Sequence, residues 1–135
     1  MSGHEVSRSI RFCYGHRILG HTGGCEHVHG HNARVEIRCA GPLDEMGMVV
    51  DFAEIRRVVE SWIQDHWDHR MLLRRDDPMA DVLRQSGEPI YEMDGDPTAE
   101  NMAACLFHVA REGGLPVVSI RFWETSTSMA AYTGP

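Results

Sequence analysis

The chain has 135 residues, the length of one ordinary domain, and 42% of them are hydrophobic, which is enough for a folded core. Its 13 basic side chains, all arginine, oppose 20 acidic ones, so that the formal net charge is −7. This balance argues against nucleic acid or an anionic membrane as a partner, because both recruit cationic surfaces. We therefore expect a single domain over residues 1–135 with no nucleic-acid or membrane partner.

No stretch approaches the roughly 20 apolar residues that cross a bilayer, and the N-terminus lacks the apolar segment of a secretory signal. The four cysteines are widely spaced and include no CxxC pair, which favours reduced thiols over disulfides. We expect a cytoplasmic protein. Cys13, Cys39 and Cys105 lie in strand or helix patterns and are interpreted as core residues, whereas Cys25 lies in a polar segment.

Alternating apolar and polar residues predict two strands near the N-terminus, over residues 5–16 and 29–41. Because side chains alternate between the two faces of a strand, His16 falls on the apolar face of the first strand. His29 and His31 extend the apolar face of the second strand by the same argument. A loop rich in glycine and threonine separates the two strands.

Two helices follow. Asp51 is suited to cap the first, with Glu54 completing a capping-box pattern, and helical periodicity continues to about Trp67. The second helix starts near residues 96–98, where a proline suits the first turn, and it ends at the glycine pair 113–114.

Residues 117–124 form a third clear strand, and residues 128–132 can return as a short fourth strand; residues 89–93 are a possible further short strand in an irregular region. The order of strands, then helices, then strands is typical of an α+β fold with an antiparallel sheet rather than of βαβ repeats.

The segment from Cys25 to His31 carries the strongest chemical signal. His29 and His31 can converge on a metal from one strand face, and His16 has the matching parity on the neighbouring strand. A catalytic zinc ion usually has three protein ligands, such as three imidazoles, and a fourth position that is open to water or substrate. The alternative is that these are ordinary surface histidines. Cys25 is a candidate thiolate base or nucleophile, and its alternatives are a fourth zinc ligand or a buried thiol.

Two carboxylates add to this set. Asp68 precedes His69, and a carboxylate that orients an imidazole is a recurring acid–base device, although adjacent residues face each other only in a turn or at a helix end. Glu124 shares the inward parity of its strand, so a buried position would require a donor-rich partner. A bidentate acceptor of this kind suits the amino-pyrimidinone edge of a pterin or guanine. The alternatives are a solvated helix end for Asp68 and His69, and a solvent position for Glu124.

In combination, these motifs resemble the 6-pyruvoyl-tetrahydropterin synthase / 6-carboxytetrahydropterin synthase family, and the resemblance covers nearly the whole chain. Their joint occurrence in order is far more specific than any one of them. The segments that carry the resemblance are Phe12 to His16, Cys25 to His31 as Cys-x3-His-Gly-His, Met48 to Phe52, Asp68-His69, Pro97 to Asn101, and Trp123 to Thr125 with Ser128.

The resemblance implies the tunnelling fold (T-fold), in which a four-stranded antiparallel sheet carries two helices on one face. It also implies a homo-oligomer, a trimer or hexamer with active sites at subunit interfaces. The implied reaction converts 7,8-dihydroneopterin triphosphate to 6-carboxy-5,6,7,8-tetrahydropterin in the queuosine (7-deazapurine) pathway, with Zn²⁺ as the cofactor. The implied site comprises His16, His29 and His31 as metal ligands, Cys25, Asp68 and His69 as catalytic residues, and Glu124, Thr98 and Glu26 as substrate-binding residues.

The sequence departs from the family pattern at Leu73, Ser126 and Met129, all outside the expected chemistry. Glu26 keeps two alternatives open, because a branch of this family replaces the cysteine with a glutamate three residues before His-Gly-His and cleaves the dihydroneopterin side chain to a hydroxymethyl product for folate. These two alternatives are 6-pyruvoyl-tetrahydropterin synthase activity and that folate-type cleavage. Two further alternatives are a pterin-binding module without catalysis, suggested by the departures at Leu73 and Met129, and a structural zinc site in which Cys25 joins the three histidines.

Overall fold

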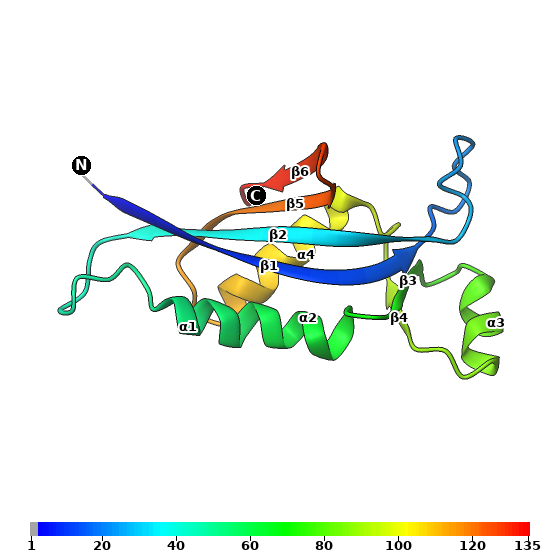
Figure 1. Cartoon of the computed structure of the whole chain (residues 1–135), viewed down its shortest axis with the longest axis horizontal. Helices are drawn as coiled ribbons and strands as arrows, with labels where there is room; N and C mark the ends of the chain where they lie inside the picture. The colour runs from blue at the N-terminus through cyan, green and yellow to red at the C-terminus, as the bar shows by residue number, and fades with distance from the viewer. Residues whose placement is uncertain (1–2) are drawn as a thin grey trace.

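The structure, a computed structural model, describes residues 3–135 (Figure 1). Its six strands form one sheet in the order β4-β3-β1-β2-β5-β6. The elements in chain order are β1 (His4–His16), β2 (His29–Gly41), α1 (Phe52–Ile55), η1 (Arg56–Glu60), α2 (Ser61–His66), β3 (Met71–Arg74), α3 (Met79–Gln85), β4 (Ile90–Met93), α4 (Ala99–Glu112), β5 (Val117–Thr125) and β6 (Ser128–Tyr132).

The two long strands β1 and β2 pair antiparallel over their whole length, from His4 opposite Gly41 to His16 opposite His29. Because this register places inward residues opposite inward residues, one face of the sheet is apolar and the other polar. The loop between the two strands, residues 17–28, projects beyond one end of the sheet (Figure 1). The histidines therefore lie at the end of the sheet from which this loop extends.

The predicted α+β class and the four antiparallel strands are confirmed as β1, β2, β5 and β6. The prediction of only four strands is wrong, because β3 and β4 extend the sheet beyond β1 as parallel neighbours. The strand β4 coincides with the possible strand at residues 89–93. The strand β3 has four residues and buries both Leu72 and Leu73, so no alternation could reveal it.

The segments α1, η1 and α2 run as one continuous helical unit, with a π-helical stretch in the middle, and α4 is the second long helix. Both pack on the apolar face of the sheet, as predicted (Figure 1). The short helix α3 was not predicted and lies at one end of the molecule. The buried core joins sheet and helices and includes Ile10, Phe12, Val35, Ile37, Ile55, Val59, Ile63, Trp67, Met102, Leu106, Ile120 and Phe122.

Asp51 caps α1 by accepting a hydrogen bond from the Ala53 N–H at 2.8 Å, as predicted. The capping box is not completed, because the Glu54 carboxylate contacts Arg57 one turn later. Among residues 3–135, no helix is long and apolar enough to span a membrane.

Candidate active site

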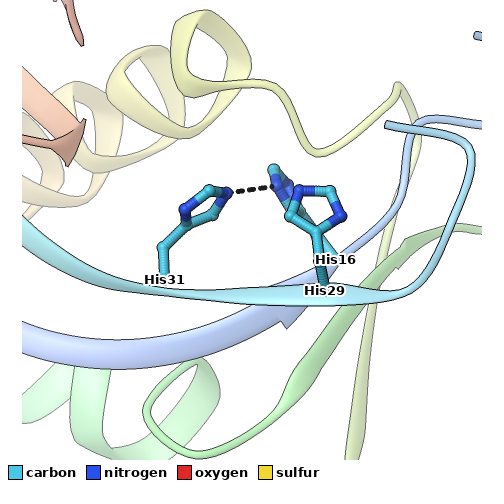
Figure 2. Close-up of side chains that lie close together, drawn as sticks. All are labelled: His16, His29 and His31. Atoms are coloured by element: carbon cyan, nitrogen blue, oxygen red, sulfur yellow. Dashed lines mark hydrogen bonds between the residues drawn. The ribbon is translucent and has the colours of Figure 1, made fainter. Parts of the chain in front are cut away.

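The structure brings His16, His29 and His31 together on the apolar face of the sheet. His16 ends β1, and the other two lie on either side of Gly30 at the start of β2, so all three rings point to the same side (Figure 2). One ring nitrogen from each lies within 4.8 Å of the others, and the Nε2 atoms of His16 and His31 are 3.1 Å apart. Tetrahedral zinc with bonds of 2.0–2.1 Å separates its nitrogen ligands by about 3.3–3.4 Å. The spacing therefore fits a single metal ion.

Backbone carbonyls orient two of these rings. His16 Nδ1 lies 2.7 Å from the Pro97 carbonyl oxygen, and His29 Nδ1 lies 2.7 Å from that of His27. A carbonyl only accepts, so each Nδ1 must donate, and in the neutral imidazole the lone pair then lies on Nε2. An outer partner of this kind fixes the tautomer of a metal-binding histidine.

The environment disfavours the protonated form of His16 and His31. His16 is 2% exposed, and burial lowers its pKa to about 4, with further lowering by the neighbouring rings of His29 and His31 and an opposing effect of the Pro97 carbonyl. The pKa of His31 is also lowered, mainly by desolvation. Neutral imidazole is the form that binds a metal.

Glu124 lies beside the histidines. Its Oε1 is 3.8 Å from His16 Nε2, and the two residues reach this position from β5 and β1. Since His16 is neutral near pH 7, the contact is not an ion pair; a carboxylate and bare nitrogen atoms face the same space. Such a cluster of acceptors favours a bound cation or an N–H-rich ligand. Tyr14 is packed next to this site, and its pKa is raised by burial and by the charge of Glu124.

Asp68 and His69 follow the end of α2 in a turn, and the positive φ of His69, 60°, lets the adjacent side chains meet. Asp68 Oδ1 lies 3.0 Å from His69 Nδ1 and also accepts a hydrogen bond from the Cys13 N–H at 3.2 Å. His69 Nε2 then faces Cys13 Sγ at 3.4 Å. The interpretation of Cys13 as a core residue is therefore wrong: it has odd parity on β1 and occupies the polar face of the sheet.

Within one chain the structure does not bring Cys25 to Asp68 and His69. Cys25 is half-buried in the loop between β1 and β2, where its carbonyl accepts a hydrogen bond from the Ile18 N–H. The neighbouring Glu26 carboxylate accepts from the Gly24 N–H at 2.8 Å and lies 3.3 Å from His27 Nε2. Hydrogen bonds from the backbone N–H groups of Glu26 and Gly24, with the charge of His27, lower the pKa of Glu26.

Sequence reasoning missed three residues that shape the site: Pro97, Tyr14 and Cys13. Pro97 precedes Thr98, whose hydroxyl caps α4 by accepting from the Asn101 N–H at 3.1 Å. The cap therefore places the Pro97 carbonyl beside His16. The strand parity of Tyr14, next to His16 on the apolar face, was a usable signal; the contact of Cys13 with His69 spans 56 residues and had no local signal.

Comparisons with known proteins agree along the chain. A family model described as 6-pyruvoyl tetrahydropterin synthase matches residues 5–135. A 6-carboxy-5,6,7,8-tetrahydropterin synthase from Rickettsia felis is 42% identical over 105 residues, which cover 76% of each chain.

Solved structures share the fold. An uncharacterised protein from Wolinella succinogenes superposes over 100% of both chains with a TM-score of 0.85 at 23% identity. The 6-pyruvoyl tetrahydropterin synthase of Caenorhabditis elegans superposes with a TM-score of 0.75 at 22% identity, covering 100% of this chain and 98% of that one. These likenesses bear out the T-fold expected from the sequence.

Proposed function

Because this chain belongs to the 6-pyruvoyl tetrahydropterin synthase family, a family of pterin-processing lyases, we propose that it is a zinc-dependent enzyme that converts 7,8-dihydroneopterin triphosphate to 6-carboxy-5,6,7,8-tetrahydropterin. The relative from Rickettsia felis carries the name of this activity. The observation that carries the proposal is the convergence of His16, His29 and His31 with the Glu124 carboxylate 3.8 Å from His16.

His16, His29 and His31 are proposed to hold the metal. Their donor set, three imidazole nitrogens with no thiolate among them, suits zinc or another borderline divalent ion better than magnesium or calcium. When bound, zinc would polarise the side-chain hydroxyls of the pterin and make their neighbouring protons easier to remove. The carbonyls of Pro97 and His27 keep two of the rings in the ligating tautomer.

Glu124 is proposed to hold the pterin ring. Its carboxylate can accept two parallel hydrogen bonds from the amino-pyrimidinone edge, and its place beside His16 would put the pterin side chain next to the metal ligands. Thr98 is proposed to contact substrate because it directly follows Pro97, whose carbonyl oxygen contacts the His16 ring. Glu26, whose carboxylate accepts a hydrogen bond from the Gly24 N–H, is proposed to bind substrate from the loop between β1 and β2.

Asp68 and His69 are proposed to transfer protons, with Asp68 holding Nδ1–H and leaving Nε2 to act as the base. Since Cys25 does not contact this pair in its own chain, we propose that the pair of one copy serves Cys25 of another in a trimer or hexamer. The proposed setting is cytoplasmic queuosine biosynthesis.

Incubation of the zinc-loaded protein with 7,8-dihydroneopterin triphosphate tests the activity. We expect 6-carboxy-5,6,7,8-tetrahydropterin, acetaldehyde and triphosphate, identified by mass spectrometry, and loss of turnover on chelation. Glu124→Gln keeps the shape and removes the charge, so it should weaken substrate binding. A 6-pyruvoyl or hydroxymethyl product would instead support the alternative activities, and no metal-dependent turnover of this substrate would refute the proposal.

Subunit complementation tests the shared site. Cys25→Ala and His69→Gln should each be inactive as homo-oligomers, and dissociation and reassembly of a mixture should restore part of the activity, because some sites then combine an intact Cys25 with an intact His69. Reassembled Cys25→Ala alone is the control. A mixture that forms mixed oligomers yet stays inactive would contradict the sharing of these residues between copies.

A further inference from the structure

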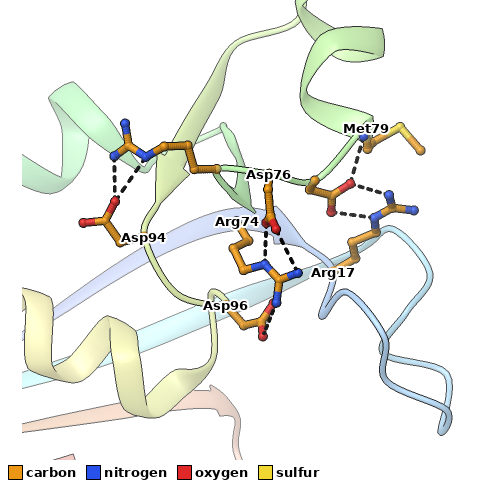
Figure 3. Close-up of polar contacts among 8 residues, drawn as sticks. Arg17, Arg74, Asp76, Met79, Asp94 and Asp96 are labelled. Atoms are coloured by element: carbon orange, nitrogen blue, oxygen red, sulfur yellow. Dashed lines mark hydrogen bonds and ion pairs between the residues drawn. The ribbon is translucent and has the colours of Figure 1, made fainter.

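Two arginines near the histidine end of the sheet, Arg17 and Arg74, are already paired with carboxylates, and Arg70 there donates to the backbone carbonyl oxygens of Gln64 and Asp68. Arg17, labelled in Figure 3, donates two hydrogen bonds to a carboxylate, that of the buried Asp77. Arg74 likewise contacts Asp76 at 2.5 Å and Asp96 at 3.4 Å. A polyanionic ligand therefore needs other cations, and on a chain of net charge −7 those cations must be locally concentrated.

Arg11 and Arg34 form such a local concentration. They lie directly opposite each other on β1 and β2, on the polar face of the sheet that the helices leave uncovered. In the part of the chain that the structure describes, neither has a carboxylate oxygen within 4.0 Å. Like charges directly opposite each other in a sheet repel, so a bound anion would relieve an unfavourable pair.

Both arginines line a cavity of about 620 Å³. The Arg34 guanidinium stacks on Trp123 of β5, with its central carbon 3.7 Å from the ring centroid. Stacking restrains the guanidinium without using its N–H groups, which stay available for a phosphate. Asn32, Thr125 and Ser126 also line the cavity, and their side chains are of types that can donate hydrogen bonds.

We propose that this cavity, the anion groove formed by Arg11, Asn32, Arg34, Trp123, Thr125 and Ser126, binds the phosphate chain of a polyphosphorylated ligand. The identity of that ligand as the substrate rests on the proposed function. The ability of the groove to bind an anion does not rest on the proposed function, because two guanidinium groups that face each other across neighbouring strands can bind any polyphosphate.

The position of the groove connects it to the proposed reaction. Cys13, Asp68 and His69 also line the cavity, so His69 lies at the same groove as the arginines. Asp68 is the one acidic residue in the lining, and its Oδ1 is already engaged by the Cys13 N–H and by His69. A substrate whose side chain lies against His69 would therefore extend its phosphates toward Arg34 and Arg11.

Calorimetric titration of the zinc-loaded protein with inorganic triphosphate tests the groove. Arg11→Gln and Arg34→Gln should each weaken binding about tenfold, since each removes charge-assisted hydrogen bonds. Arg38→Gln is the matched control: it removes the same charge from the same face of β2, but Arg38 is paired with Glu5 and Glu36, so affinity should stay unchanged. Equal affinity of wild type and Arg34→Gln, or equal weakening by Arg38→Gln, would overturn the proposal.

Arg34→Lys keeps the charge and loses the planar fork, so it should bind with intermediate affinity, and it replaces Arg34→Gln if that variant fails to fold. Steady-state kinetics separate this inference from the proposed function. Arg34→Gln should raise KM for 7,8-dihydroneopterin triphosphate with little change in kcat. An unchanged KM with normal turnover would defeat the groove alone. If triphosphate binding depends on these arginines but the protein does not turn over the pterin, the groove proposal would stand and the proposed function would be refuted.

Discussion

The burial of the His16 imidazole affects both the stability of the fold and the affinity of the site for a metal. It is held by the Pro97 carbonyl at 2.7 Å and faces Glu124, Tyr14, His29 and His31. Burial disfavours the protonated form of His16. The neutral imidazole therefore keeps a lone pair, which is directed at the other two rings. The same burial makes the metal-free protein sensitive to mild acid.

We predict that the metal-free protein loses stability as the pH falls from about 6.5 to about 4. The pKa of His16 is lowered from 6.5 to about 4 on folding, so the unfolded chain takes up a proton in this interval before the folded chain does. The stability present above pH 6.5 should fall by on the order of 3 kcal/mol from this group. Urea titrations across pH measure it. His16→Gln should reduce the slope of the free energy of unfolding against pH in this interval. A variant with the same slope as wild type would contradict the assignment to His16.

The stability contributed by Asp77 is lost in a lower pH range than that contributed by His16. Its pKa is lowered by the hydrogen bonds from Arg17, so the stability from this group is lost only below the ordinary carboxyl pKa of 3.8. The two effects therefore separate along the pH axis.

Replacing Cys13 distinguishes support of His69 from covalent chemistry. Cys13 Sγ lies 3.4 Å from His69 Nε2, so we expect Cys13→Ala to lower kcat by about fivefold through the loss of one weak hydrogen bond. Cys25→Ala should abolish turnover. Single-turnover rates on both variants make the comparison, and complete loss of activity in Cys13→Ala would identify Cys13, rather than Cys25, as the reacting thiol.

At the scale of elements, the two helical units meet where α4 ends. Gly113 follows the last turn of α4 as its C-cap, and a Cβ built there would overlap Val58 of η1. The φ of Gly113 is −77°, so the need for glycine comes from this close approach and not from the backbone conformation. The contact fixes how closely α4 packs against the π-helical segment.

We predict that Gly113→Ala destabilises the fold by about 1–3 kcal/mol, because the added methyl must displace a β-branched neighbour in a packed interface. The measurement is the urea midpoint at constant slope. Gly3→Ala is the control, since a Cβ there meets nothing within 4 Å. A Gly113→Ala midpoint equal to wild type would show that η1 moves aside without cost.

For the whole molecule, the proposed metal joins β1 to β2 at the end of the sheet beyond which their connecting loop extends. A ligand that binds only the folded state adds stability in proportion to the logarithm of its free concentration over Kd. Metal binding should therefore appear in thermal unfolding even without substrate.

We predict that zinc at about a thousand times its Kd adds about 4 kcal/mol and raises Tm by on the order of 10 °C. Differential scanning calorimetry with and without chelator measures the shift. His29→Gln should abolish most of it, whereas His108→Gln, an exposed position on α4, should retain it. A shift preserved in His29→Gln would place the stabilising metal elsewhere.

Much of this architecture was accessible from periodicity. The parity of His16, His29 and His31 predicted their common face, and the Asp51 cap and the proline near residues 96–98 predicted where the two long helices begin. The strand β3 was not accessible, because four residues buried on both faces show no alternation.

The sequence by itself determined which residues alternate inward, where the helices begin, and that three imidazoles would share one side of a sheet. These are local properties, set by the two-residue period of a strand and by capping groups within a turn. Only the tertiary structure decided that Cys13 meets His69, that Arg17 and Arg74 pair with carboxylates, and that Arg11 and Arg34 lie directly opposite each other. Each of these facts depends on strand register or on contacts between distant segments, which no local pattern encodes.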